Sequence, residues 1–134
     1  MTIKRMTKAD HPVSFGAFKP VGHVVVALPD EARTQAARAA LFEVGFDEED
    51  VLHYSAEEEG SEMSRMLHHT SQLAGFGYEI TLMRRYQQLA REGCSWLLVY
   101  APDEAHATRV ADVAKRFDAR VAEKYHRLVI EDLI

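Results

Sequence analysis

Seven histidines are the side chains of this sequence best suited to chemistry, and their spacing limits what they can do. Two histidines bind one metal ion most easily when they lie four residues apart on a helix. His68 and His69 are adjacent, so on a helix they would point about 100° apart. The sequence contains neither a Cys-x-x-Cys nor a His-x-x-x-His pattern. We therefore expect no metal and no other cofactor.

Carboxylates near the middle of the chain offer a second kind of chemistry. Glutamates 57–59 and Glu62 form an acidic run, and His69 lies one heptad beyond Glu62. A glutamate held beside a histidine can transfer protons. The same run suits the solvated start of a helix, where the helix dipole stabilises negative charge. The helix start is the simpler interpretation, and we expect no catalytic residue.

Gly75-Phe76-Gly77 and Cys94 are the remaining candidates for chemistry. The glycine segment lacks the lysine that follows in a phosphate-binding loop, so it indicates a hinge or close helix packing. Cys94 has no neighbour that would activate a thiolate, and we expect a buried structural cysteine. As the only cysteine it forms no internal disulfide, which fits a reducing, cytoplasmic environment.

Histidine and tyrosine side chains form the candidate site for a small ligand. Some lie on the second and last expected strands, which we expect at the two edges of the sheet, and the others lie in the segment between strands 2 and 3. Residues on the two edge strands would be far apart within one subunit and would meet only across a dimer. The candidate ligand-binding residues are His53, Tyr54, His68, His69, Tyr78 and Tyr125.

The composition is that of an ordinary globular protein, with 134 residues, 47% hydrophobic and 28% charged. No apolar run approaches the ~20 residues that span a bilayer, so we expect no membrane partner. The net charge of -5 disfavours binding to nucleic acid. Residues 1–20 are the basic exception, and we expect an irregular arm that is either solvated or docked on an anionic partner.

Residues 21–134 are expected to form a single α/β domain built from two strand–helix–strand units. Apolar runs predict strands at 23–28 and 95–100, each followed by Pro-Asp-Glu-Ala, a typical helix start. The second strand is expected at about 51–55. The last strand is expected from about 120 to 130. This repeat indicates an internal duplication.

The pattern of residues 57–93 predicts a helical insertion between the second and third strands. Apolar side chains at helical spacing flank Gly75 and Gly77. Two glycines inside a helix cost roughly 1 kcal/mol each relative to alanine. We therefore expect a break there, and a second helix that Gly93 ends.

The two units together predict an α+β fold, a ferredoxin-like split βαβ sandwich. Its four-stranded antiparallel sheet would have both crossover helices on one face and the helical insertion between strands 2 and 3. We expect the strands that begin at His23 and Ser95 to be central, adjacent and parallel. A doubly wound parallel sheet is the alternative, but the polar strand at 51–55 is poorly suited to its interior.

The sheet face opposite the crossover helices also needs cover, because an exposed apolar face of that size is unfavourable. The insertion covers part of it, and we expect a second subunit to cover the rest, giving a homodimer. Two apolar stripes are the candidate contact faces of the dimer, and the alternative is that they belong to the core of a single subunit. The stripes are Met63/Met66/Leu67 and Leu82/Met83/Tyr86.

The layout resembles the bacterial heat-induced, general-stress-protein domain family over most of residues 23–130. The resemblance lies first in the strand at 24–28, the alanine-rich helix at 32–41 and Gly45-Phe46. It continues in Ala74-Gly75-Phe76-Gly77 and in the run from Tyr86 through Gly93 to the last strand. This chain departs from the family pattern in its short glycine-rich stretch. The resemblance implies a stress-associated protein with no established catalytic residues.

Three functions remain open on the sequence. The first is a non-enzymatic, oligomeric, stress-associated protein that acts through protein contacts. The second is a regulatory domain that senses a small molecule, with its site at the dimer interface or beside the insertion, by analogy with other ferredoxin-like domains. The third is an enzyme that uses histidine, tyrosine and glutamate side chains in a cleft.

Overall fold

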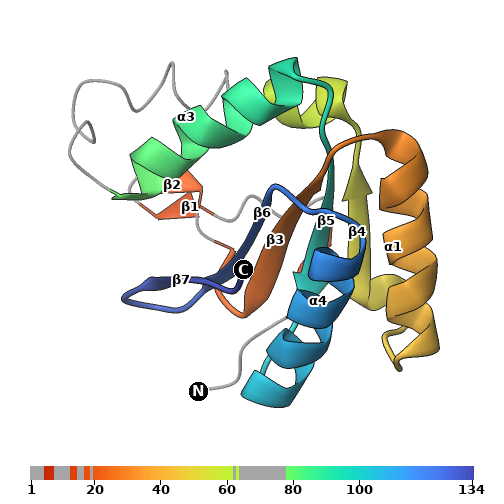
Figure 1. The fold of residues 1–134 in the computed structure, drawn as a ribbon. Helices are drawn as coiled ribbons and strands as arrows, with labels where there is room; N and C mark the ends of the chain where they lie inside the picture. Colours follow the sequence, from red (N-terminus) through yellow and green to blue (C-terminus); the bar gives the residue numbers. More distant parts are fainter. Residues whose placement is uncertain (1–4, 8–12, 15–16, 19, 62, 64–77) are drawn as a thin grey trace.

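An antiparallel sheet of five strands forms the centre of the computed structural model (Figure 1). The structure describes residues 5–7, 13–14, 17–18, 20–61, 63 and 78–134. The strand order is β4-β5-β3-β6-β7, and each neighbouring pair is antiparallel. The strands are β3 (His23–Leu28), β4 (Val51–Tyr54), β5 (Ser95–Tyr100), β6 (Val121–Tyr125) and β7 (Ile130–Asp132).

Helices cover both faces of this sheet (Figure 1). Helices α1 (Glu31–Glu43) and α4 (Glu104–Arg116) pack side by side on one face, as the repeat predicts. Helix α3 (Tyr78–Arg91) covers the opposite face, and residues 56–61 are also helical. The fold is therefore α+β with an antiparallel sheet, and the doubly wound parallel alternative is excluded.

The two crossover helices begin in the same way, which supports the internal repeat. Asp30 caps α1 by accepting a hydrogen bond from the Arg33 amide at 2.7 Å. Asp103 caps α4 by accepting one from the His106 amide at 2.9 Å. An aspartate at this position satisfies an amide that has no partner within the helix. The shared Pro-Asp-Glu-Ala is thus a pair of equivalent helix starts.

Glycines with left-handed backbone end α1 and α3. Gly45 has φ of 104° and Gly93 has φ of 96°, and both values suit a residue without a Cβ. The Phe46 amide donates to the Leu41 carbonyl, and the Cys94 amide to the Leu89 carbonyl, each at 3.1 Å. Gly93 therefore ends the helix as predicted, whereas the predicted break at 75–77 lies outside the described residues.

Alternating side chains on the strands build two separate cores. Beneath α1 and α4 the core consists mainly of aliphatic and alanine side chains, with Val24, Val26 and Leu28 from the central strand. Beneath α3 the core is richer in aromatic and polar groups, including Tyr86, Trp96 and Tyr125. Side chains alternate between the faces of a strand, so neighbouring residues enter different cores.

Two expectations about the strands were wrong. The strands that begin at His23 and Ser95 are adjacent and central, but they run antiparallel rather than parallel. Neighbouring strands must alternate in direction in an antiparallel sheet. The second strand of each strand–helix–strand unit is therefore parallel to the first strand of the same unit, and one strand of the other unit lies between them. The predicted last strand is also two strands, because the chain reverses after Tyr125 and pairs β7 with β6. The sheet therefore has five strands instead of four, and β6 is not an edge.

Part of the N-terminal arm is regular rather than irregular. Strands β1 (Val13–Ser14) and β2 (Ala17–Phe18) form a short hairpin, and β2 lies against α3 (Figure 1). Arg5 donates at 2.6 Å to Glu49 and at 2.9 Å to Asp50, beside the short helix η1 (Glu48–Asp50). The arm therefore docks on acidic side chains of its own chain.

No helix within the described ranges has both the length and the apolar character required to cross a membrane.

Candidate functional site

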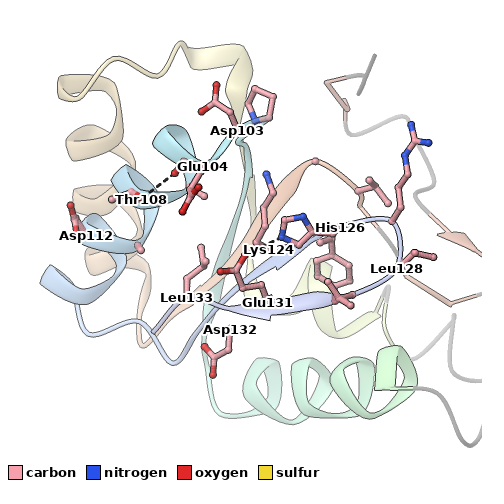
Figure 2. Close-up of a pocket in the computed structure, with 18 of the residues that line it drawn as sticks. Asp103, Glu104, Thr108, Asp112, Lys124, His126, Leu128, Glu131, Asp132 and Leu133 are labelled. Carbon is pink, nitrogen blue, oxygen red and sulfur yellow. Dashed lines mark hydrogen bonds and ion pairs between the residues drawn. The ribbon is translucent and has the colours of Figure 1, made fainter. Parts of the chain in front are cut away.

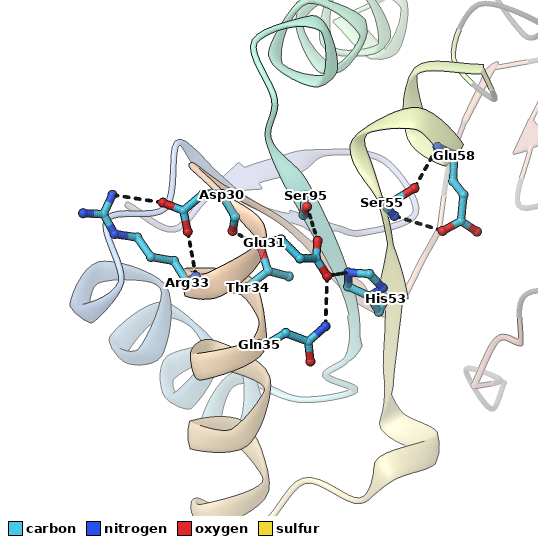
Figure 3. Close-up of polar contacts among 9 residues, drawn as sticks. All are labelled: Asp30, Glu31, Arg33, Thr34, Gln35, His53, Ser55, Glu58 and Ser95. Carbon is cyan, nitrogen blue, oxygen red and sulfur yellow. Dashed lines mark hydrogen bonds and ion pairs between the residues drawn. The ribbon is translucent and has the colours of Figure 1, made fainter.

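The first polar cluster is centred on Glu31, in the first turn of α1 (Figure 3). Ser95 Oγ donates to Glu31 Oε2 at 2.5 Å, and Gln35 Nε2 donates to Glu31 Oε1 at 2.9 Å. His53 Nε2 lies 2.7 Å from Glu31 Oε1, in ion-pair range but not aligned as a hydrogen bond. Burial opposes ionisation of Glu31, but the hydrogen bonds and the His53 ring outweigh it, so the pKa of Glu31 is lowered.

This Glu31 cluster has the residue types of a catalytic triad but not its order. In a triad the histidine contacts the serine and removes its proton, while the acid orients the histidine. Here the glutamate lies between Ser95 and His53 and contacts both. The cluster therefore joins the start of α1 to β5 and β4, which is a structural role.

The second polar cluster lies between α3 and the sheet. The hydroxyl groups of Tyr86 and Tyr125 are 2.9 Å apart, and the Tyr86 ring packs edge-on against Trp96 at 5.0 Å between ring centroids. Burial, reinforced by Tyr125 and nearby carboxylates, raises the pKa of Tyr86 well above its usual value. Tyr86 therefore stays protonated and links α3 to strands β5 and β6.

Glu123 is the least expected member of this second cluster. It lies on β6, directly opposite Val25 of β3 and Asp132 of β7, and its side chain is buried on the α3 side. Burial, with the charge of Asp132, raises the pKa of Glu123 to about 7, although Arg85 opposes the shift. Within the part of the chain that the structure describes, Glu123 Oε2 and Trp96 Nε1 are buried without hydrogen-bond partners. Such groups are expensive to bury, which makes them candidates for ligand contact.

A groove of about 960 Å³ separates α4 from the hairpin formed by β6 and β7 (Figure 2). We call it the α4 groove. Its apolar part includes Val21, Pro102, Ala107, Ala111 and Leu133. The charged residues that line it are Asp103, Glu104, Asp112, Lys115, Lys124, His126, Arg127, Glu131 and Asp132, although the Asp132 side chain points away from α4 (Figure 2).

Some charges in the α4 groove are already paired. Lys124 is buried and donates to the Ala101 carbonyl, and burial lowers the pKa of its ammonium group. His126 Nε2 lies 3.0 Å from Glu131 Oε1. Asp103 is 2.6 Å from the His106 ring, and the hydrogen bond from the His106 amide is the main reason that the pKa of Asp103 is lowered. The residues that line the groove include five carboxylates but only two lysines and one arginine, so the groove is acidic overall.

The hairpin tip, defined as Arg127, Leu128 and Val129, forms one end of this groove. The His126 amide donates to the Val129 carbonyl at 2.9 Å and closes the turn. Leu128 is 93% exposed and Val129 is 62% exposed, and Figure 2 shows Leu128 at the end of the hairpin remote from α4. Turns favour glycine, proline, asparagine and aspartate, so the turn itself gives no reason for an exposed leucine followed by valine.

The predicted ligand-binding residues whose side chains the structure describes lie on both faces of the sheet. His53 faces α1, whereas Tyr54 and Tyr125 lie on the α3 side of the sheet. Tyr125 is fully buried on the inner strand β6, whereas His53 and Tyr54 lie on the edge strand β4, as expected. His68 and His69 lie outside the described residues, as does the side chain of Tyr78.

The described side chains that were predicted to form the dimer contact lie in the core instead. Met63, Leu82, Met83 and Tyr86 are buried and pack against the sheet. They therefore form the intramolecular core that was the alternative interpretation, while Met66 and Leu67 lie outside the described residues. Cys94 is buried as expected, and burial raises the pKa of its thiol.

Sequence reasoning missed Glu123, Lys124 and the hairpin tip. The signal for the two buried charges was their position in Val121-Ala122-Glu123-Lys124-Tyr125, where adjacent charged residues lie on opposite faces of an inner strand. The tip was hidden because Arg127-Leu128-Val129-Ile130 reads as a continuation of the strand. Among the described residues, no group of three histidine, cysteine, aspartate or glutamate side chains could hold a metal ion.

Comparisons with protein-family models, with curated proteins and with solved structures find no match to this chain.

Proposed function

We propose that this chain is a non-enzymatic module that acts through protein contacts made by the hairpin tip and the adjoining α4 groove. The observation that carries this proposal is the exposure of Leu128 and Val129, side by side at the end of a hairpin. Apolar side chains ringed by charged ones are typical of protein interfaces. The charged rim of the α4 groove supplies such surroundings.

Photo-crosslinking in living cells tests this proposal. A photoreactive amino acid is introduced at Leu128 in one strain and at Val44 in another. Val44 is 37% exposed at the end of α1 and serves as the matched apolar control. We expect discrete protein adducts from position 128 and none from position 44. Absence of adducts at position 128, or equal labelling at both positions, would overturn the proposal.

We also propose that the fold is ferredoxin-like, with β7 as an additional edge strand. The order β4-β5-β3-β6, taken without β7, is that of two interleaved strand–helix–strand units, and α1 and α4 share one face. Backbone NOEs linking β3 to both β5 and β6 would check the pairing on which this assignment depends.

The association with stress follows from the resemblance to the general-stress-protein domain. A protein whose role belongs to stress should accumulate when cells are heated. We expect its abundance to rise relative to total protein after a heat shock, measured by quantitative mass spectrometry. Unchanged abundance under heat and under other common stresses would remove the stress association without affecting the contact surface.

A small-ligand regulatory domain is the second candidate function. The buried atoms Glu123 Oε2 and Trp96 Nε1, which lack partners among the described residues, favour it. A ligand that donates to the carboxylate and accepts from the indole would satisfy both. Thermal-shift screening with protonated amines and amino acids is the direct test, because a ligand that binds the folded state raises the melting temperature. The shift should disappear in Glu123→Gln and persist in the surface control Glu43→Gln.

A further inference from the structure

We infer that the partner of the hairpin tip is a second copy of this chain, so that each tip enters the α4 groove of the other in a two-fold dimer. This inference rests on the proposed function, because it names the partner for the same surface. It also moves the expected dimer interface from the methionine stripes, whose described members are buried, to α4 and the β6–β7 hairpin in the C-terminal part of the chain.

The tip has the chemistry of an anchor. Leu128 and Val129 are its exposed apolar side chains, and Arg127 stands next to them in the same turn. No other described residue forms an ion pair with Arg127. The His126–Val129 hydrogen bond closes the backbone of the anchor into a turn before it binds. A preformed anchor loses little conformational entropy on binding.

The α4 groove has the matching chemistry. Its floor includes the small side chains Ala107 and Ala111, which leave room for larger apolar groups. Glu104 and Asp112 are exposed on α4 along the groove, one at each side of these alanines in sequence. Neither carboxylate forms an ion pair with another described residue. The groove can thus receive both the apolar part of a tip and its arginine.

A second copy is favoured because one chain carries both halves of the interaction. The two-fold arrangement applies the same contact twice, since the same patch on each subunit contacts the other. One tip alone is small compared with the roughly 1,200–2,000 Å² that a stable interface buries. Reciprocal insertion doubles the contact and brings the two hairpins and the two α4 helices to one interface. An unrelated partner would need both an anchor and a groove of its own to make the same pair of contacts.

Sedimentation equilibrium of the purified full chain measures the dimer. We expect wild type to be dimeric and Leu128→Glu to raise the dissociation constant by about 30-fold, as loss of an interface hot spot does. Val44→Glu, a control at an exposed apolar residue outside the tip, should leave the dissociation constant unchanged. Circular dichroism should show all chains folded, since Leu128 and Val44 are exposed. A monomeric wild type, or equal weakening by both substitutions, contradicts the inference.

A charge exchange tests the pairing of Arg127 with the α4 groove. Arg127→Glu places like charges together in its homodimer, and so does the double variant Glu104→Lys/Asp112→Lys. Mixing the two chains pairs opposite charges at both insertions. We expect each variant alone to be weakened and the mixture to form a heterodimer. If the mixture stays monomeric, the hairpin tip does not enter the α4 groove.

The outcomes also separate this inference from the proposed function. Position 128 adducts that contain only other proteins, with a monomeric purified chain, would refute the second copy and keep the protein-contact module. Absence of position 128 adducts, with a monomeric purified chain, would refute both. Adducts between two copies, together with heterodimer formation by the charge-exchanged mixture, support both.

Discussion

At the scale of single residues, the sheet carries polar groups where an apolar side chain would pack more simply. Glu123 lies in the α3-side core opposite Asp132, and its pKa is raised to about 7. The folded state therefore keeps a proton that the unfolded chain releases at its usual pKa of 4.5. Between these two values the folded state binds more protons than the unfolded state, so the stability of the protein falls as pH rises.

Glu123→Gln should remove this pH dependence. The contribution of Glu123 is fully present below pH 4.5 and is lost as pH rises through about 7. Glutamine cannot ionise, so at pH 8 the variant should be more stable than wild type by about 3 kcal/mol. Urea unfolding at a series of pH values gives the measurement.

Glu43→Gln is the control for this experiment, since Glu43 is an exposed residue of α1. It should retain the wild-type dependence on pH. Parallel pH profiles for wild type and Glu123→Gln would show that Glu123 ionises in the folded protein as it does in water.

Ser95 offers a second test at the residue scale. It is buried, and its hydroxyl donates to Glu31 across the gap between β5 and α1. Ser95→Ala removes a hydrogen bond to a charged group and should lower the free energy of unfolding by about 1.5–3 kcal/mol, measured by urea denaturation. A neutral result would mean that the Glu31 cluster does not hold α1 to the sheet.

At the scale of elements, the Asp30 side chain caps the start of α1. Asp30 accepts from the Arg33 amide, so Asp30→Ala should cost about 1 kcal/mol of stability. Asp30→Asn keeps an oxygen that accepts the same bond and should lie close to wild type. If both variants lose the same amount of stability, Asp30 stabilises α1 through its charge rather than through the capping hydrogen bond.

The sequence predicted those elements whose local pattern and tertiary role agree. The apolar runs at β3 and β5 and the Pro-Asp-Glu-Ala helix starts locate these elements because each pattern has one simple outcome. The β6–β7 hairpin could not be predicted in the same way. Its turn uses Arg127 and Leu128 instead of the residues that normally mark turns, and only pairing between β6 and β7 reveals it.

The helix α1 shows the same limit on a smaller scale. Ala37, Ala40 and Leu41 are buried, whereas the equally apolar Ala36 and Val44 are exposed and the polar Thr34 is buried. Alanine-rich helices have little contrast between their faces, so the orientation depends on packing against α4 and the sheet. Packing is a property of the whole fold rather than of the local sequence.

At the scale of the whole molecule, the sheet is covered on both faces, and the α4 groove with its hairpin tip lies at one side (Figures 1 and 2). The sequence predicted that each face needs a cover, and that α1 and α4 share one of them. It did not predict the candidate site, because the groove is formed by residues near 22, 102–115 and 124–133 that only the fold brings together.

Disulfide trapping between two differently labelled chains tests the contact surface most directly. Both chains carry Cys94→Ala, one also carries Leu128→Cys, and the other also carries Thr108→Cys in the α4 groove. We expect a mixed disulfide dimer under mild oxidation, and little when Val44→Cys replaces Leu128→Cys. If the Val44→Cys chain is trapped as efficiently, or if Leu128→Cys and Thr108→Cys chains do not join, the hairpin tip is not seated in the α4 groove of a second copy.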